Sequence, residues 1–321
     1  MKLVVSHYTD EYKKQVMNLI CREYNYELKT YTEFFHKFYE HQFQHNAIKI
    51  IVIDEDAHNL VVGFFALFHW PYQLNSKKYN AYKGVNAIVM PEYRGCGIFK
   101  KILKFVDENL NTTPQIDFLI ATPLPAAFIG FKKNNWKHLL DLHWYIKPNS
   151  LFSFLFPIND FKLKSIFNEK KLNNITLIKN QIHQDDSETF NDWRAYYYKT
   201  KKYYLSYKDG NDIVQFGVKI NIRKKIIREL IIGEVATNNY ETQFLMKGLN
   251  HLCKEVKKIH AISFLSIAAN PHNDIIIEAI KLNNFNKIKK VIHIVVKDLT
   301  NNTQLLNQKK WVLYRADLDS W

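Results

Sequence analysis

The residues that most plainly suit chemistry lie in the range 82–110. An apolar run ends there at a proline, and Arg94, Gly95 and Gly97 follow within a few residues. Because glycine has no Cβ, the backbone N–H groups around Gly95 and Gly97 can approach a ligand closely. The apolar spacing predicts a helix from Ile98, whose first N–H groups lack partners inside the helix and lie at the positive end of its dipole. The sequence therefore predicts an anion site at this loop, with Arg94 as a further positive group.

Two familiar phosphate-binding motifs do not fit this loop. A Walker A loop requires Gly-Lys-Ser/Thr, whereas Gly97 is followed by Ile98 and Phe99. A dinucleotide fingerprint requires a third small residue where Lys100 stands. The loop must therefore serve another anionic cofactor, or be an ordinary glycine turn before a helix.

The segment PEYRGCGIF, residues 91–99, resembles the pyrophosphate loop of the GCN5-related N-acetyltransferases, the GNAT superfamily. The family pattern Arg/Gln-x-x-Gly-x-Gly/Ala is matched from Arg94 to Ile98, while Phe99 occupies the last Gly/Ala position. The resemblance implies that acetyl-coenzyme A binds here as the acyl donor, with no metal. The cofactor-binding residues that it implies are Ile88, Val89, Met90, Arg94, Gly95, Cys96, Gly97, Ile98, Phe99, Lys100 and Phe131.

Phe131 departs from the family pattern. Counted back from Trp136, it stands where the family element Tyr-x-Lys-x-Gly-Phe has a tyrosine that often protonates the departing thiolate of coenzyme A. Phenylalanine has no proton to give. Either another group donates the proton, or the thiolate leaves unaided and is protonated by water.

The acceptor amine of such a reaction must lose a proton before it attacks, and in the family a glutamate on or near the central strand often relays it. The central strand offers only Asn86. The nearest candidates for the base are Glu92, at the end of that strand, His69, at the end of the preceding strand, and Glu23, near the end of the first helix. An ordinary solvated surface position is the competing interpretation of each.

The predicted elements belong to an α/β protein with a mixed, mostly antiparallel sheet flanked by helices. Periodicity predicts strands at 2–7, 48–53, 60–68 and 85–90, and helices at about 12–20, at 30–43 and from 98. Strand, two helices, hairpin, central strand and loop-bearing helix is the GNAT order. The range 70–82 has no periodicity and is predicted to be a loop that borders the acceptor pocket.

The C-terminal half repeats the first half in weakened form. ISFLSIAANP, from Ile262, matches IDFLIATPLP, from Ile116, and Asn-Asn-Phe at 283–285 matches Asn-Asn-Trp at 134–136. At the same offset, 238–241 replaces the glycine loop without glycines and with a glutamate, so we expect this copy not to hold the cofactor. The prediction is two GNAT-like domains in tandem, an N-terminal one at 1–148, a connector at 149–190 and a degenerate one at 191–321.

Composition sets further limits. The chain has 321 residues, 47% of them hydrophobic, which suits two domains. The net charge of +14 is spread along the chain without a nucleic-acid motif, so we expect a basic surface that attracts an anionic cofactor and no nucleic-acid partner.

The three cysteines, Cys21, Cys96 and Cys253, lie far apart, which fits a reducing cytoplasm. A thiolate role for Cys96 is the weaker interpretation of its place in the loop.

No apolar run is long enough to span a membrane, and the first residues do not form a signal peptide, so we expect a soluble protein that does not bind membranes. The apolar run LFSFLF, 151–156, is too short for an anchor, and a docking patch for another subunit is left open.

Asp317 and Asp319 alternate in the closing segment, as residues on an edge strand do. The default interpretation is that these charges keep an edge strand soluble, and the alternative is a carboxylate pair that binds a ligand.

The predicted reaction is transfer of an acyl group, acetyl by default, from coenzyme A to a primary amine of a small molecule such as an amino sugar or its nucleotide. Two alternatives stay open. One is a catalytically inactive, GNAT-like protein that binds or senses coenzyme A, which Phe131 favours. The other is an aminoacyltransferase of the peptidoglycan type, which would use a transfer RNA carrier. The acyl length, the acceptor and a homo-oligomeric state are not fixed by the sequence.

Overall fold

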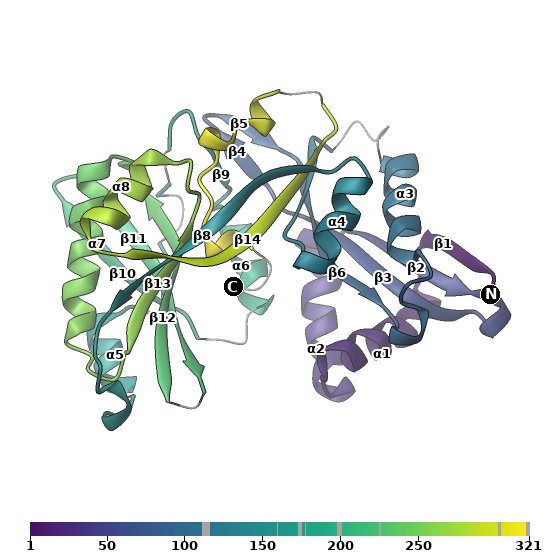
Figure 1. Cartoon of the computed structure of the whole chain (residues 1–321), viewed down its shortest axis with the longest axis horizontal. Helices are drawn as coiled ribbons and strands as arrows, with labels where there is room; N and C mark the ends of the chain where they lie inside the picture. The colour runs from purple at the N-terminus through teal and green to yellow at the C-terminus, as the bar shows by residue number, and fades with distance from the viewer. Residues whose placement is uncertain are drawn as a thin grey trace.

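The computed structural model describes residues 1–110, 116–158, 160–172, 175–176, 178–197, 201–224, 226–300 and 303–318. Within these ranges the chain forms one eleven-stranded mixed sheet flanked by helices, in the order β1-β2-β3-β6-β7-β14-β8-β13-β12-β11-β10 (Figure 1). A three-stranded sheet, β5-β4-β9, lies beside it. The predicted α/β class and the mixed, mostly antiparallel sheet are confirmed.

The N-terminal half, residues 1–148, builds one end of the large sheet. Its strands β1, β2, β3 and β6 pair in antiparallel order, and β7 joins β6 in parallel. Their bounds are β1 (Leu3–His7), β2 (Ile48–Asp54), β3 (Leu60–His69), β6 (Ala81–Val89) and β7 (Phe118–Ala121). Residues of β2 alternate between two cores, with Ile51 and Ile53 in one and Ile50 and Val52 in the other, as expected of a strand covered on both faces.

Two helix pairs provide that cover. The helices α1 (Lys13–Tyr24) and α2 (Leu28–Tyr39) pack in the core that contains Ile51, whereas α3 (Ile98–Leu110) packs in the core that contains Ile50, next to α4 (Pro125–Lys133) (Figure 1). The apolar stripe of each helix forms the contact. The glycine loop before α3 therefore lies on one face of the sheet, and the ends of α1 and α2 lie on the other.

The C-terminal half, residues 149–318, repeats this arrangement. Its strands β12 and β13 are parallel, as β6 and β7 are, and α7 follows β12 as α3 follows β6. The remaining bounds are α5 (Asp160–Ile166), β9 (Ile182–Gln184), α6 (Glu188–Tyr197), β10 (Tyr203–Asp209), β11 (Asp212–Arg223), β12 (Ile227–Thr237), α7 (Thr242–Lys257), β13 (Phe264–Ala269) and α8 (Asp274–Leu282).

The two halves exchange their last long strands. β14 (Asn286–Asp298) lies between β7 and β8, both from the N-terminal half, and β8 (Lys137–Pro148) lies between β14 and β13. Figure 1 shows these two strands crossing the middle of the molecule side by side. Because each half completes the sheet of the other, the folding unit is the whole chain.

Two local predictions are wrong. The range 70–82 is not a loop but holds β4 (Tyr72–Leu74) and β5 (Lys77–Tyr79), a hairpin whose partner β9 is more than a hundred residues away. Such distant pairing leaves no local periodicity. Asp317 ends the 3-10 turn Arg315–Asp317 rather than standing on a strand, and Asp319 lies outside the described residues.

None of the described helices is long and apolar enough to cross a membrane.

Candidate active site

The glycine loop is an exposed bend between β6 and α3. Gly95 has a φ of 86° and Gly97 a φ of 74°, a region in which any residue with a Cβ is strained. The helix begins at Ile98 as predicted, and the amide of Lys101 donates to the carbonyl of Gly97 at 3.0 Å. Earlier amides of a helix have no acceptor within it. The loop thus presents N–H groups at the positive end of α3.

A wedge opens beside this loop because β6 and β7 diverge. They pair only from Ala81 to Gly84, where Gly84 lies opposite Ala121, so the range 85–89 of β6 continues without β7. A bulge causes the divergence, since Asn86 and its neighbour together oppose a single residue of β3. Asn86 has a φ of 51°, which asparagine tolerates better than most residues. The free edge of β6 runs from this bulge to the glycine loop.

Three tyrosines surround the bulge on the face covered by α1 and α2. The side-chain amide of Asn86 donates to the hydroxyl of buried Tyr39, and the hydroxyl of exposed Tyr24 donates to the side-chain Oδ1 of Asn86 at 3.4 Å. Tyr39 is also hydrogen-bonded to Tyr31, whose pKa burial raises. These polar groups thus extend from the interior to solvent at the apex of the wedge, which is the place where β6 and β7 begin to diverge. Sequence reasoning missed these tyrosines, because Tyr31 and Tyr39 at i and i+8 resemble a core stripe.

The two carboxylate candidates both lie beside the loop, each in an ion pair. Glu23, from α1, contacts the guanidinium of Arg94 at 2.7 Å, and Arg22 pairs with Glu92. The hydrogen bond from Arg22 lowers the pKa of Glu92, which makes this carboxylate a weaker base. The end of α1 is therefore held against the loop by two exposed ion pairs.

His69 is not brought to the loop. It pairs with Tyr82 at the far end of β3, whereas Gly63 pairs with Val89 beside the loop. Six residues of strand separate the two places by about 20 Å. The imidazole packs against Phe43, with ring centroids 5.3 Å apart, and burial lowers its pKa. The three candidate bases thus occupy two separate places.

The predicted cofactor residues divide by burial. The side chains of Ile88 and Ile98 are each 2% exposed, which leaves only their backbone for a ligand. Phe131 is 3% exposed and packs between Phe99 and Trp136, with ring centroids 5.1 and 4.9 Å away. The other predicted cofactor residues are half-buried or exposed; they are Val89, Met90, Arg94, Gly95, Cys96, Gly97, Phe99 and Lys100.

Several known protein structures share this architecture. No family model and no curated protein matches the sequence. A GCN5-related N-acetyltransferase from Anabaena variabilis gives a TM-score of 0.58 at 11% identity, covering 93% of this chain and 73% of that one. A probable N-acyltransferase from Enterococcus faecalis gives 0.56 at 11% identity, with coverage of 93% and 73%. Saccharomyces cerevisiae N-myristoyltransferase with bound myristoyl-CoA gives 0.50 at 12% identity, with coverage of 100% and 85%. The chain has the GNAT fold.

The GNAT-like wedge of the C-terminal half is closed. β12 and β13 pair only up to Ile232 and Ile267, yet the gap beyond is filled by the chain end, where Tyr314 bridges to Ala269. Tyr240, in place of the glycine loop, is half-buried, and its hydroxyl lies 3.4 Å from that of Tyr314. The second wedge therefore contains protein where the first is open.

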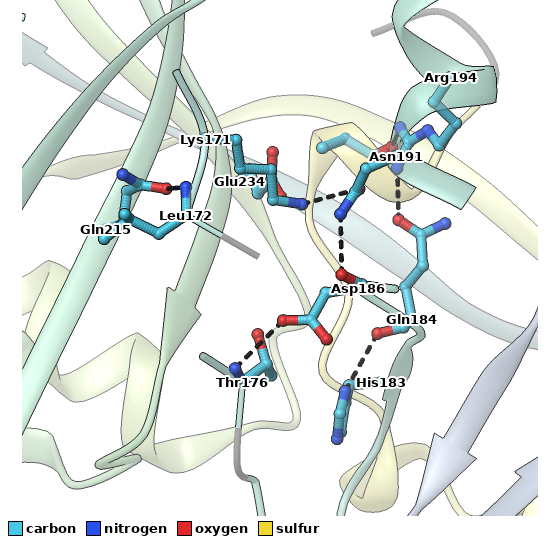
Figure 2. Close-up of polar contacts among 11 residues, drawn as sticks. Lys171, Leu172, Thr176, His183, Gln184, Asp186, Asn191, Arg194, Gln215 and Glu234 are labelled. Carbon is cyan, nitrogen blue, oxygen red and sulfur yellow. Dashed lines mark hydrogen bonds and ion pairs between the residues drawn. The ribbon is translucent and has the colours of Figure 1, made fainter. Parts of the chain in front are cut away.

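A polar network lies beside the closed wedge. Lys171 pairs with Glu234 of β12 and donates to Asn191 at 2.9 Å, and Asn191 donates to the carbonyl of Asp186 at 2.8 Å (Figure 2). Burial alone would raise the pKa of Glu234, but the charge and hydrogen bond of Lys171 outweigh it and lower that pKa. A small hollow, partly open to solvent, lies next to this network. Most of its polar lining is already paired.

Proposed function

We propose that the chain is an acyl-CoA-dependent N-acyltransferase whose N-terminal half binds the acyl donor. One observation carries the proposal: the wedge between β6 and β7 opens onto a glycine loop at the start of α3, in a fold shared with acyltransferases. A pyrophosphate suits the amides of this loop and the charge of Arg94. The free edge of β6, range 85–89, offers backbone partners for the amide groups of a pantetheine arm.

The residues present fit such a donor, which would supply the acyl group as a thioester. The loop and Arg94 hold the anionic end, and β6 directs the arm toward Asn86 at the apex. There the exposed Tyr24 provides a hydroxyl that can orient an acceptor amine, and buried Tyr39 positions the Asn86 side chain. The amine nitrogen forms a bond to the carbonyl carbon, the carbon–sulfur bond breaks to release the coenzyme A thiolate, and the proton lost by the amine passes to water.

A dedicated acid at Phe131 is not required for this reaction. A thiol of this type has a pKa near ~8.5, so its thiolate is a tolerable leaving group at neutral pH. A general acid typically contributes only ~10² to 10⁴ in rate. We therefore propose a modest acyltransferase, with a primary amine of a small molecule, such as an amino sugar or its nucleotide, as the acceptor and acetyl as the first acyl group to test.

The experiment has two stages on the full chain. Calorimetry with acetyl-CoA and with longer acyl-CoA thioesters is expected to show one site per chain. Thiol release is then followed with a panel of amino sugars, polyamines and peptide N-termini, and release above hydrolysis with at least one amine is expected. Binding without release would replace the proposal by the sensing alternative, which Phe131 favours, and absence of binding would contradict both.

A further inference from the structure

The turn after β8 presents apolar side chains to solvent. Within 151–156, the exposed fractions are 85% for Leu151, 62% for Phe152, 54% for Phe154, 64% for Leu155 and 43% for Phe156. We call 151–156 the apolar turn. Contiguous exposed apolar surface of this kind is uncommon on a monomeric protein and marks a contact surface.

The exposure is fixed by the structure of the turn. Ser153, the one inward residue, places its hydroxyl 2.6 Å from that of Ser263. Arg228 donates to the carbonyl of Ser153 at 2.9 Å and to that of Phe156. The amide of Leu155 donates to the carbonyl of Phe152 at 3.0 Å. Several backbone groups of the turn are thus paired within the protein, which lowers the cost of placing the turn in a poorly hydrated environment.

A second protrusion lies at the same end of the molecule. The tip of the β11–β12 hairpin exposes Ile222 and Ile226, each by 56%, and Arg228 of β12 joins it to the apolar turn. Figure 1 shows the tip and the turn after β8 at the lower end of the C-terminal half. Basic residues accompany the apolar ones, with Lys224 in the tip and Lys257 at the end of α7 both exposed.

We propose, contrary to the expectation from the sequence, that this face binds the surface of an anionic membrane, with the apolar turn and the hairpin tip entering the headgroup region. Apolar residues beside lysine and arginine are the composition of interfacial membrane-binding segments. Basic residues near an anionic surface are attracted to it, and the net charge of +14 acts in the same direction. A second copy would bring the same positive charge to the contact, which opposes self-association. Six residues cannot span a bilayer, so the binding is peripheral.

Co-sedimentation of the full chain with vesicles tests the proposal. We expect binding to vesicles of phosphatidylcholine with phosphatidylserine, weak binding to phosphatidylcholine alone, and loss of binding as salt is raised. The double variant Phe152→Ser/Phe154→Ser should weaken binding to the anionic vesicles at least tenfold. Lys224→Glu should weaken it less and reduce its salt dependence.

A matched control comes from α4, where Leu124 precedes the helix and Ile129 lies on it, with exposed fractions of 77% and 60%. Leu124→Ser/Ile129→Ser should bind vesicles as the wild type does. An unchanged melting temperature in every variant would exclude misfolding and keep the result independent of the proposed enzyme function. Equal vesicle binding by Phe152→Ser/Phe154→Ser and wild type would overturn the proposal. So would concentration-dependent dimerisation that this variant abolishes, without vesicle binding.

Discussion

The two halves share the order of strand, helix and parallel strand but differ in what occupies the wedge between the parallel strands. In the N-terminal half, an exposed loop with two glycines at positive φ stands beside an open strand edge. In the C-terminal half, Tyr240 replaces the glycines, and the chain end with Tyr314 fills the gap. The same backbone arrangement thus leaves an open wedge or a packed core according to a few side chains.

The charges follow the same division. The pair of Glu23 with Arg94 in the first wedge has side chains 32% and 54% exposed, whereas Lys171 and Glu234 in the second are 14% and 18% exposed. An exposed pair is weakly stabilising, so a ligand can replace one partner at little cost. A buried pair leaves a strongly unfavourable charge when one partner is removed. The first pair suits exchange, and the second suits structure.

The largest effect is expected from Lys171→Met. It leaves Glu234 mostly buried without its main partner, and the free energy of unfolding should fall by about 3 kcal/mol. Urea denaturation at neutral pH measures the change. The double variant Lys171→Met/Glu234→Gln should recover a large part of the loss. Equal stability of the single variant and the wild type would show that the closed wedge does not depend on this pair.

The next effect depends on pH and concerns Asp317, which closes the second wedge. Burial is the main cause that raises its pKa from 3.8 to about 6. A carboxyl group whose pKa is raised on folding stabilises the fold while protonated, below its unfolded pKa, and this contribution is lost as pH rises through the folded pKa. Asp317→Asn removes the dependence and retains an oxygen for the amide of Tyr314.

A shift of about two pKa units corresponds to about 3 kcal/mol. The stability of Asp317→Asn relative to wild type should therefore improve by about 2 to 3 kcal/mol between about pH 4 and about pH 7. Denaturant titrations at several pH values supply the comparison. A difference that stays constant across this range would mean that Asp317 does not titrate there.

The glycine loop and helix of the N-terminal half could be predicted from the sequence because their signals are local. Gly95, Gly97 and the helix from Ile98 adjoin one another, and positive φ at the glycines is a backbone demand that the residue type itself reveals. What sequence reasoning missed depends on contacts between distant residues. The pairing of β4 with β9, the exchange of β8 and β14, and the meeting of Tyr24 with Asn86 leave no periodic pattern in any single segment.

Arg94→Ala tests whether the open wedge binds an anionic ligand. Removal of the guanidinium should weaken coenzyme A binding by about 1.5 to 3 kcal/mol, the usual contribution of a hydrogen bond to a charged partner. Calorimetry and the melting temperature are measured together. Lys254→Ala, an exposed cation on α7 of the closed half, is the control and should leave affinity unchanged. An unaltered affinity in folded Arg94→Ala would contradict the anion site.

The smallest effect is expected from Glu23→Gln. The carboxylate of Glu23 lies 2.7 Å from the guanidinium of Arg94, so a bound pyrophosphate must compete with it. An exposed pair of this kind contributes about 0 to 1 kcal/mol, and its loss should lower unfolding stability by no more than that. Because Arg94 is then released from its competitor, coenzyme A affinity should rise, by at most about fivefold. If Glu23 also accepts the proton of the amine, acyl transfer at saturating donor falls while donor affinity rises, and a base at another position leaves turnover unchanged. A decrease in donor affinity would show instead that Glu23 holds Arg94 in its binding position, and the exposed pair of the first wedge would then be as structural as the buried pair of the second.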